Sequence, residues 1–400
     1  MSGTAPRTLD TAFRRAGIAL AVAAAILAPR PIAAGTAFDF EQPVLVDPGF
    51  TIKDHSLVYR ESRYHIYYIR GDERSFGHAS SPDLKHWTLH DTILYTGPES
   101  WDERMIWAPF IVDTRNVLGY DLMYYTGVNN RIAQRVCLAL GTSPQSWYKA
   151  PVDLFVPFHG DTSWIAWSED AWSNYRDPHF FDDGGYHYLI NTAWTKDNLG
   201  AIALARSEDY FNWTDAGPLY VHNSWHVLES ANLIVRNGRY HLFFTEETIG
   251  GVSYMFSDSL TSGWDITKRA IIDNGAAPEF HQVNSDKYLF SRHSSYLAPS
   301  GEKISTIKID TLAFHEGFVR IDFTNYLADD WTVLSGNAFT RQPIFGDNPS
   351  YRGEEPGSIG FEGNWWIGTY ECFNGPLSNT LPGATQGDGA TGSIRSRNFV

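Results

Sequence analysis

The chain has 400 residues, of which 43% are hydrophobic and only 19% are charged. This composition excludes an intrinsically disordered protein, because disorder requires few apolar residues and many charges. The formal net charge of −15 disfavours binding to nucleic acid, since one polyanion repels another. Aromatic residues reach 15%, which is typical of an all-β core and also suits a neutral carbohydrate partner, whose ring can stack on an aromatic face.

Residues 1–34 have the pattern of a secretory signal peptide. Three arginines within the first fifteen residues precede an unbroken run of small and apolar residues from Ala16 to Ala28, and a small-residue cleavage site follows. The run is too short for a comfortable membrane span, although an uncleaved anchor is the alternative. The pair Arg14-Arg15 hints at twin-arginine export. We expect an exported protein, periplasmic or extracellular, with no membrane attachment after signal removal.

A hairpin pattern recurs along the chain: a short apolar strand, a tight polar turn and a strand rich in aromatic residues. Two of the turns contain Asp-Gly or Asn-Gly, at residues 182–185 and 236–239, and such turns between apolar runs are strong hairpin signals. Clear copies span residues 54–68, 177–189 and 229–244, and looser copies span residues 107–125 and 278–290.

A second element follows four of these hairpins, in which a strand of small residues leads to a Ser and then a Trp. The four tryptophans are 60, 66 and 51 residues apart, and they are Trp87, Trp147, Trp213 and Trp264. A period near fifty residues with about four strands in each unit is typical of a propeller blade.

The sequence therefore predicts an all-β fold, a five-bladed β-propeller with four-stranded antiparallel blades around a central channel, over residues 38–373. The fifth unit is degenerate, so residues 357–361 and 364–370 either close the ring or begin a sixth blade. Residues 374–400 are rich in Gly, Ser and Thr and are expected to form a loose C-terminal tail.

The histidines and cysteines give weaker signals. His65, His187 and His241 occupy one position in three hairpins, so we interpret them as packing or hydrogen-bonding residues rather than metal ligands. Two cysteines, Cys137 and Cys372, are too few for a disulfide framework, and the sequence leaves open whether they pair.

Acidic residues interrupt the apolar pattern where three of the hairpins begin. The first strand of each hairpin should line the channel, so the starts of these strands should converge at one mouth. We place Asp54, Asp177 and Glu229 at this position. Carboxylates that converge repel one another, which raises the pKa of at least one of them. One protonated and one ionised carboxylate are what glycoside hydrolysis requires. The alternative is that they are ordinary acids at strand edges.

At these residues the chain resembles the five-bladed propeller glycosidases, chiefly glycoside hydrolase family 43, with features of families 62, 32 and 68. The resemblance covers roughly residues 54–290. Its motifs are Trp107-Ala108-Pro109, Arg176-Asp177-Pro178 followed by residues 180–184, and Glu229 ahead of residues 236–240.

The resemblance implies a role for each acid. Asp54 matches the general base of the inverting families or the nucleophile of the retaining ones, Asp177 the residue that orients substrate and modulates the acid, and Glu229 the general acid. Arg176 and Trp107 are candidate substrate-binding residues, although Arg176 could instead pair with another acid. The resemblance implies no required cofactor and no catalytic metal, but a structural calcium ion near His281 is possible.

We therefore predict a secreted glycoside hydrolase that cleaves at arabinose, xylose or fructose residues of oligo- or polysaccharides, with inversion favoured. Three alternatives stay open: a phosphorylase, suggested by Arg292-His293, a non-catalytic carbohydrate-binding propeller, and a retaining transglycosylase. The oligomeric state is open too. Further residues expected near the mouths of inner strands are His78, Trp172, Tyr175, Trp225 and Arg292.

Overall fold

The computed structural model describes most of the chain between residues 45 and 322 and four short strands beyond it. The described ranges are 45–98, 101–225, 228–246, 251–273, 275–285, 287–297, 303–315, 318–322, 331–335, 343–345, 365–367 and 393–396. The predicted signal segment 1–34, the predicted domain ends at residues 38 and 373, and Cys372 lie outside these ranges.

Five four-stranded antiparallel sheets make up the fold, each in the order of the sequence. Blade 1 contains β1 (Ile52–Arg60), β2 (Arg63–Arg70), β3 (Ser75–Ser81) and β4 (Thr88–Tyr95). Blade 2 contains β5 (Met105–Val112), β6 (Asp121–Val128), β7 (Gln134–Ser143) and β8 (Ser146–Lys149), with the short helix α1 (Arg115–Leu118) between β5 and β6. Blade 3 contains β9 (Tyr175–Asp183), β10 (Tyr186–Trp194), β11 (Gly200–Ser207) and β12 (Thr214–Val221). Blade 4 contains β13 (Leu228–Arg236), β14 (Arg239–Glu246), β15 (Gly251–Ser257) and β16 (Ala270–Asp273), with the 3₁₀ helix η1 (Ile266–Lys268) before β16. Blade 5 contains β17 (Ala276–Gln282), β18 (Lys287–Leu297), β19 (Lys303–His315) and β20 (Phe318–Asp322).

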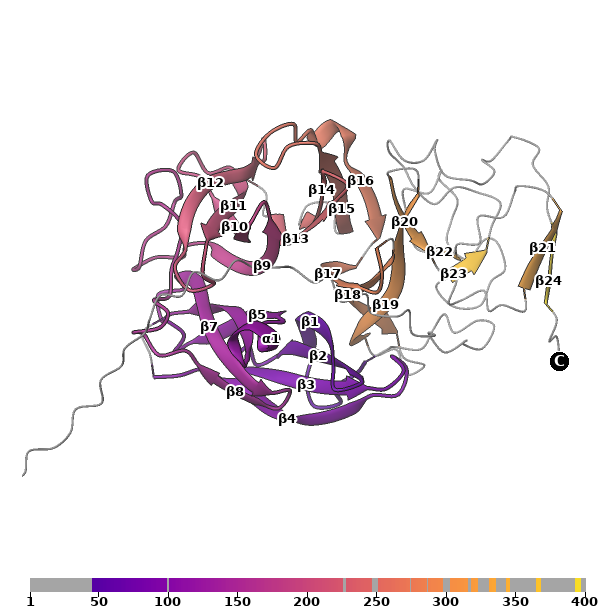
Figure 1. Ribbon diagram of the computed structural model, residues 1–400, viewed down its shortest axis with the longest axis horizontal. Coiled ribbons are helices and arrows are strands. Elements are labelled where there is room, and N and C mark those ends of the chain that lie inside the picture. The colour runs from indigo at the N-terminus through magenta and orange to yellow at the C-terminus, as the bar shows by residue number, and fades with distance from the viewer. Residues whose placement is uncertain are drawn as a thin grey trace, which may run out of the picture. The chain divides into compact units, whose positions relative to one another are not determined.

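The first strands of the five blades form a closed ring. Strand β1 contacts β5, β5 contacts β9, β9 contacts β13, β13 contacts β17, and β17 returns to β1. In Figure 1 these five strands gather around the centre of the propeller, while β4, β8 and β12 lie at its edge. The predicted all-β, five-bladed propeller is confirmed.

The contact between β17 and β1 closes the ring. Residues 357–361 lie outside the described ranges, and of residues 364–370 only 365–367 are described. These form β23 (Trp365–Ile367), which pairs with β22 (Pro343–Phe345) in a separate two-stranded sheet. Inside the predicted C-terminal tail, β24 (Ser393–Ser396) pairs with β21 (Trp331–Ser335).

A segment before β1 joins the first blade to the last. Leu45 forms an isolated antiparallel bridge with Ile307 of β19, and its carbonyl accepts a hydrogen bond from the Thr306 hydroxyl over 2.7 Å. Two residues further on, Asp47 accepts a hydrogen bond from the Tyr68 hydroxyl over 2.8 Å. Blade 5 is thereby held to blade 1 by non-local contacts that the hairpin pattern alone does not contain.

The repeated tryptophans share one structural role. Each indole N–H donates to a backbone carbonyl in the turn between the third and fourth strands of its blade. The pairs are Trp87 with Leu84, Trp147 with Pro144, Trp213 with Tyr210 and Trp264 with Leu260. The predicted repeat thus marks a structural turn, and the hydrophobic core lies as separate clusters of buried residues between neighbouring blades.

The histidine prediction is confirmed for all three residues. His65 is buried and forms a hydrogen bond with His78 over 2.9 Å, and His241 is buried and forms one with the Tyr254 hydroxyl over 2.8 Å. His187 pairs with Asp182 over 2.6 Å.

Cys137 is buried in blade 2, where burial raises the pKa of its thiol. Its pairing with Cys372 stays open. No helix in the described part of the chain is long and apolar enough to cross a membrane.

Candidate active site

Every innermost strand leaves its regular pairing register near its beginning. The ladder is interrupted between Ile52 and His55 in β1, and four equivalent interruptions lie in β5, β9, β13 and β17. Such bulges bend a strand and redirect its side chains. In four of the five, one residue has a positive φ: Ala108 at 44°, Asp177 at 57°, Ser230 at 51° and Ala277 at 50°. Positive φ is uncommon for residues with a side chain, and strain of this kind gathers at functional sites.

The bulges correct one detail of the sequence prediction. Two positions are equivalent when they lie the same number of residues before the hairpin turn of their blade. By this count Asp54 corresponds to Asp177, but in blade 4 the equivalent residue is Ser230. Glu229 comes one residue earlier, at the position of Arg176. The prediction of three acids at one repeat position is therefore wrong for Glu229, which reaches the same cavity from the neighbouring position.

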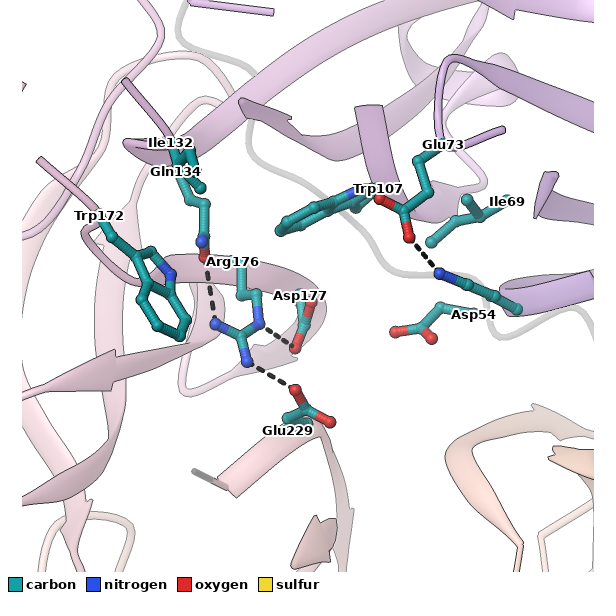
Figure 2. Close-up of a pocket in the computed structure, with 11 residues that line it drawn as sticks. Asp54, Ile69, Glu73, Trp107, Ile132, Gln134, Trp172, Arg176, Asp177 and Glu229 are labelled. Carbon is teal, nitrogen blue, oxygen red and sulfur yellow. Dashed lines mark hydrogen bonds and ion pairs between the residues drawn. The ribbon is translucent and has the colours of Figure 1, made fainter. Parts of the chain in front are cut away.

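The three predicted acids and the two predicted substrate-binding residues line one cavity of about 500 Å³ at the mouth of the channel (Figure 2). They are Asp54, Trp107, Arg176, Asp177 and Glu229, and the cavity is completed by Lys53, Ile69, Glu73, Ile132, Gln134 and Trp172. The volume suits one or two sugar rings.

Asp54 is fixed by a residue of another blade. Its Oδ2 accepts a hydrogen bond from the Ser230 hydroxyl over 2.8 Å. Burial, and then the negative charges of Asp177 and Glu229, raise the pKa of Asp54 to about 7, while the bond from Ser230 acts in the opposite direction. Near neutral pH this carboxyl therefore exchanges a proton readily, as a catalytic base or acid must.

Asp177 is the most enclosed of the three acids, with 6% of its surface exposed. Its Oδ2 accepts hydrogen bonds from the Ser230 backbone N–H and from the Thr192 hydroxyl, each over 3.0 Å. Its own backbone N–H donates to the Thr126 hydroxyl over 2.9 Å. Burial raises the pKa of Asp177, and the adjacent Arg176 guanidinium opposes that rise. These contacts fix Asp177 in place, which suits a supporting role.

Arg176 connects the acids to one another. Its Nη2 donates to Glu229 Oε1 over 2.6 Å, and its Nε lies 3.4 Å from Asp177 Oδ2. On the other side, Nη1 donates to Gln134 Oε1 over 3.1 Å and to Asn174. Arg176 therefore pairs with both Asp177 and Glu229. The Glu229 side chain is 40% exposed, so its carboxyl group faces the open cavity.

The two sides of the cavity differ in character (Figure 2). Trp172, Gln134 and Arg176 lie on one side, and Asp54 lies on the other together with Glu73. Lys53 forms an ion pair with Glu73 there. The sequence reasoning missed Ser230, Gln134, Lys53 and Glu73, since each belongs to a short polar segment with no distinguishing pattern.

The remaining candidates from the sequence differ in whether they line the cavity. Trp172 lines the cavity and is 60% exposed, whereas Trp225 is exposed but does not line it. His78 and Tyr175 are fully buried. Arg292 is also buried, in ion pairs with Asp273 and Asp310, so it does not provide the phosphate-binding cation that a phosphorylase would need at the mouth.

A second, much smaller cavity of about 10 Å³ lies next to Asp54 and Asp177. It is lined in part by Glu279 of β17, a fourth carboxylate that the sequence reasoning did not identify. Burial raises the pKa of Glu279 well above its ordinary value, and Asp54 adds to the rise. Asn232 donates a hydrogen bond to Glu279 over 3.3 Å.

The possible calcium site at His281 finds little support in its surroundings. Its ring packs edge-on against Tyr64, and burial, then the positive charge of Arg60, lower the pKa of His281 to about 4. Among the described residues, no group of three or more His, Cys, Asp or Glu side chains is arranged to hold a metal ion. The calcium ion near His281 stays a prediction.

Five antiparallel blades with carboxylates around the mouth of the channel define the class of this protein, a propeller glycoside hydrolase. The model of the family described as "Glycosyl hydrolases family 43" matches residues 41–291, more than half of the chain. The chain therefore belongs to glycosyl hydrolase family 43, and both the predicted resemblance and the predicted enzyme class are confirmed.

The chain is also similar to two relatives of known sequence. The chain is 27% identical over 274 residues to a β-D-galactofuranosidase of Aspergillus niger, which covers 63% of this chain and 76% of the relative. It is 21% identical over 267 residues to a sucrose-6-phosphate hydrolase of Vibrio alginolyticus, covering 62% of this chain and 51% of the relative. The chain thus spans about half the length of the second relative.

Solved structures share the fold. A thermostable family-43 glycoside hydrolase superposes with a TM-score of 0.52 and 20% identity, covering 69% of this chain and 95% of its own. A Bombyx mori GH32 β-fructofuranosidase superposes with a TM-score of 0.54 and 16% identity, covering 70% of this chain and 64% of its own. At these identities the likeness shows the fold alone.

Proposed function

We propose that this protein is an exported glycosidase that hydrolyses glycosidic bonds at arabinose, xylose or fructose residues of oligo- or polysaccharides. The observation that carries the proposal is the single cavity in which Asp54, Asp177 and Glu229 meet, with Arg176 bridging two of them. The name of the Aspergillus niger relative adds galactofuranose to the candidates for the cleaved sugar.

Glu229 is the proposed general acid. Its Oε1 accepts the hydrogen bond from Arg176, which leaves the other carboxyl oxygen to protonate the glycosidic oxygen as the bond breaks. Its exposure to the cavity gives a substrate direct access. General acid catalysis of this kind contributes roughly 10²- to 10⁴-fold to the rate.

Asp54 is the proposed general base. In its ionised form it removes a proton from the water that attacks the anomeric carbon on the face opposite the leaving group. Asp177 accepts hydrogen bonds through the oxygen nearest Ser230 and Thr192, and it is proposed to orient the substrate and to adjust the proton affinity of the two working acids. Inversion of configuration is the expected outcome, and NMR of the first product anomer tests it.

The decisive experiment is a screen of the purified protein on aryl furanosides and on arabino-, fructo- and galactofuranose-containing glycans. We expect wild type to turn over at least one of them, and Glu229→Gln to lose about 10²- to 10⁴-fold in kcat on aryl glycosides with poor leaving groups. Glu61→Gln is the matched control, because Glu61 is an exposed acid in the hairpin turn at the other end of β1.

The same screen decides between the alternatives. Equal activity of wild type and Glu229→Gln on every responsive substrate contradicts the assignment of the acid. No turnover with measurable sugar binding indicates a non-catalytic propeller. A rate that depends on added phosphate indicates a phosphorylase, and transfer products at high sugar concentration indicate a transglycosylase.

Export rests on the N-terminal pattern alone. We propose cleavage near residue 34, so that the mature protein begins just before the propeller and is released to the periplasm or the medium. Mass spectrometry of the mature N-terminus from the native host tests this. A full-length chain retained in the cell contradicts it.

A further inference from the structure

The Arg176 guanidinium is held from two sides (Figure 2). On the acid side, Nη2 donates to Glu229 Oε1 over 2.6 Å, and Nε lies 3.4 Å from Asp177 Oδ2. On the other side, Nη1 donates to two neutral amide oxygens, Oε1 of Gln134 over 3.1 Å and Oδ1 of Asn174. Because a guanidinium is planar, the contacts that fix Nη1 also fix the direction in which Nη2 donates.

Asn174 is the less accessible of the two amides. Its exposed fraction is 0%, and it does not line the large cavity, so a substrate cannot touch it. Its Nδ2 group is buried and finds no hydrogen-bond partner among the residues that the structure describes. A buried donor without a partner destabilises the folded state. An amide kept at this cost to stability points to a role in the site, and its bond to Arg176 supplies one.

The backbone before Asn174 is anchored to blade 2. The Ser173 N–H donates to the Ile132 carbonyl over 3.3 Å, and the Ser173 carbonyl accepts from the Gln134 N–H over 3.0 Å. The Gln134 carbonyl in turn accepts from the Trp167 indole over 2.8 Å. Both amide side chains therefore start from backbone that is fixed before any substrate binds, and they hold the guanidinium in a set place.

Glu229 depends on this support more than Asp177 does. The Glu229 side chain is 40% exposed, and the hydrogen bond from Arg176 fixes its carboxyl group. The Asp177 side chain is 6% exposed and accepts further hydrogen bonds from Ser230 and Thr192. A carboxyl group at the end of three rotatable bonds turns easily when its partner moves. Misplacing a catalytic group by about 1 Å costs up to about 10²-fold in rate.

The neutrality of the two amides matters for the acid. A carboxylate in place of Asn174 or Gln134 would form a charge-assisted bond with Arg176 and would compete with Glu229 for the guanidinium. An amide oxygen accepts the hydrogen bond but carries no net charge. The positive charge of the guanidinium therefore stays available on the side of the acids.

We propose that Asn174 and Gln134 are positioning residues for the general acid. They orient Arg176, which holds Glu229 so that its free carboxyl oxygen faces the glycosidic oxygen. They act through Arg176 and do not contact the reacting atoms. The inference rests on the proposed function, in which Glu229 protonates the leaving oxygen.

The test compares two substrates with the same cleaved sugar, an aryl glycoside with a poor leaving group and the glycosyl fluoride. Cleavage of the fluoride needs no proton from the acid, so only the aryl glycoside reports on how Glu229 is aimed. We expect Asn174→Ala to lower kcat about tenfold on the aryl glycoside and less than about twofold on the fluoride. Gln134→Met, which keeps the length of the side chain and removes the acceptor, should show the same substrate dependence.

Asn191→Ala is the matched control. Asn191 is as buried as Asn174, at 0% exposed, and it lies in β10, which pairs with β9, without lining the cavity. The ratio of its kcat values on the two substrates should equal that of wild type. An equal change of this ratio in Asn191→Ala and Asn174→Ala would show a general effect of truncating a buried asparagine and would overturn the positioning role.

A double-mutant cycle with Glu229→Gln shows whether the amides act through the acid. In the Glu229→Gln background no acid is left to be aimed. Adding Asn174→Ala should therefore lower kcat on the aryl glycoside less than about twofold further. A tenfold loss in both backgrounds would show that Asn174 acts independently of Glu229 and would overturn the proposal.

The remaining outcomes separate the positioning role from the proposed function. An equal loss on both substrates, or no loss on the aryl glycoside, overturns the positioning role while hydrolysis stands. Failure of wild type to turn over any glycoside or glycosyl fluoride overturns the proposed function itself. Activity on the fluoride near that of wild type also shows that a variant is folded. If Asn174→Ala does not fold, Gln134→Met decides by the same criteria.

Discussion

The hydroxyl of Ser230 donates a hydrogen bond to Oδ2 of Asp54 over 2.8 Å. The backbone N–H of the same serine donates to Asp177 Oδ2 over 3.0 Å. Ser230 adopts its positive φ inside the bulge of β13, and this geometry lets one residue of blade 4 connect acids from blades 1 and 3. The backbone geometry of Ser230 in blade 4 thus sets the separation of the Asp54 and Asp177 carboxylates.

Ser230→Ala tests whether this bond tunes the proposed base. A hydrogen bond to the ionised form lowers a carboxyl pKa, so its loss raises the pKa of Asp54 above about 7. A base must be ionised to work, so the acidic limb of the kcat/KM profile should move to higher pH. Activity should fall several-fold more at pH 6 than at pH 9. A profile lowered uniformly, with an unmoved limb, would indicate a structural role only.

Glu229→Gln should move the acidic limb of the kcat/KM profile to lower pH. The negative charge of Glu229 is one of the causes that raise the pKa of Asp54, so its removal lowers that pKa. The profile must be measured on a glycosyl fluoride, because this substrate needs no proton from the general acid. We expect an acidic limb below that of wild type. A limb at or above the wild-type position would show that the two carboxyl groups are not electrostatically linked.

The architecture could be predicted from the repeat pattern. Hairpins with tight polar turns and aromatic second strands recur in the printed sequence, and β1–β2, β9–β10 and β13–β14 form there because the strands and turns are local. Asp54 and Asp177 could be found in this way, since they stand at equivalent distances from their turns.

The rest of the site depends on contacts between distant segments. Glu229 is displaced by one position from the other two acids, and it reaches the cavity because a bulge redirects the strand, which no periodic pattern encodes. In the sequence Ser230 and Gln134 cannot be distinguished from other polar residues, because only contacts between blades make them part of the site. Ile132 and Trp172 come together only because the 129–134 turn is hydrogen-bonded to residues 169–173.

Arg176 provides a test of how the acids are held together. Asp177 is 6% exposed and has Arg176 as its ion-pair partner, so Arg176→Ala leaves a nearly buried carboxylate without a counter-charge. Breaking a buried pair in this way costs about 3–5 kcal/mol. The loss should be smaller at pH 5 than at pH 8, because the raised pKa of Asp177 lets it take up a proton.

Arg176→Lys should recover only part of this stability. An ammonium group replaces the charge but cannot reproduce a planar fork that contacts Asp177, Glu229 and Gln134 at once. Chemical denaturation at the two pH values measures both variants. A loss for Arg176→Ala that is the same at pH 5 and pH 8 would contradict an electrostatic role.

Glu279 allows a prediction about stability that is separate from catalysis. Burial raises the pKa of Glu279 well above its ordinary value of 4.5. As the pH rises through 4.5, the unfolded chain therefore releases this proton while the folded chain keeps it. The folded state binds more protons, so the free energy of unfolding falls as the pH rises above that point. The free energy of unfolding falls by about 1.4 kcal/mol for each pH unit until Glu279 ionises in the folded state.

Glu279→Gln should remove this loss of stability, because the amide is neutral at every pH and its oxygen can still accept the hydrogen bond from Asn232. We expect the variant to be more stable than wild type at pH 8 and no more stable at pH 4. Urea unfolding at both pH values measures the difference, with the exposed Glu208→Gln as control. A variant less stable than wild type at pH 8 would show instead that the ionised Glu279 is held by a favourable partner, and the assignment of a neutral, proton-bearing carboxyl group beside Asp54 would be wrong.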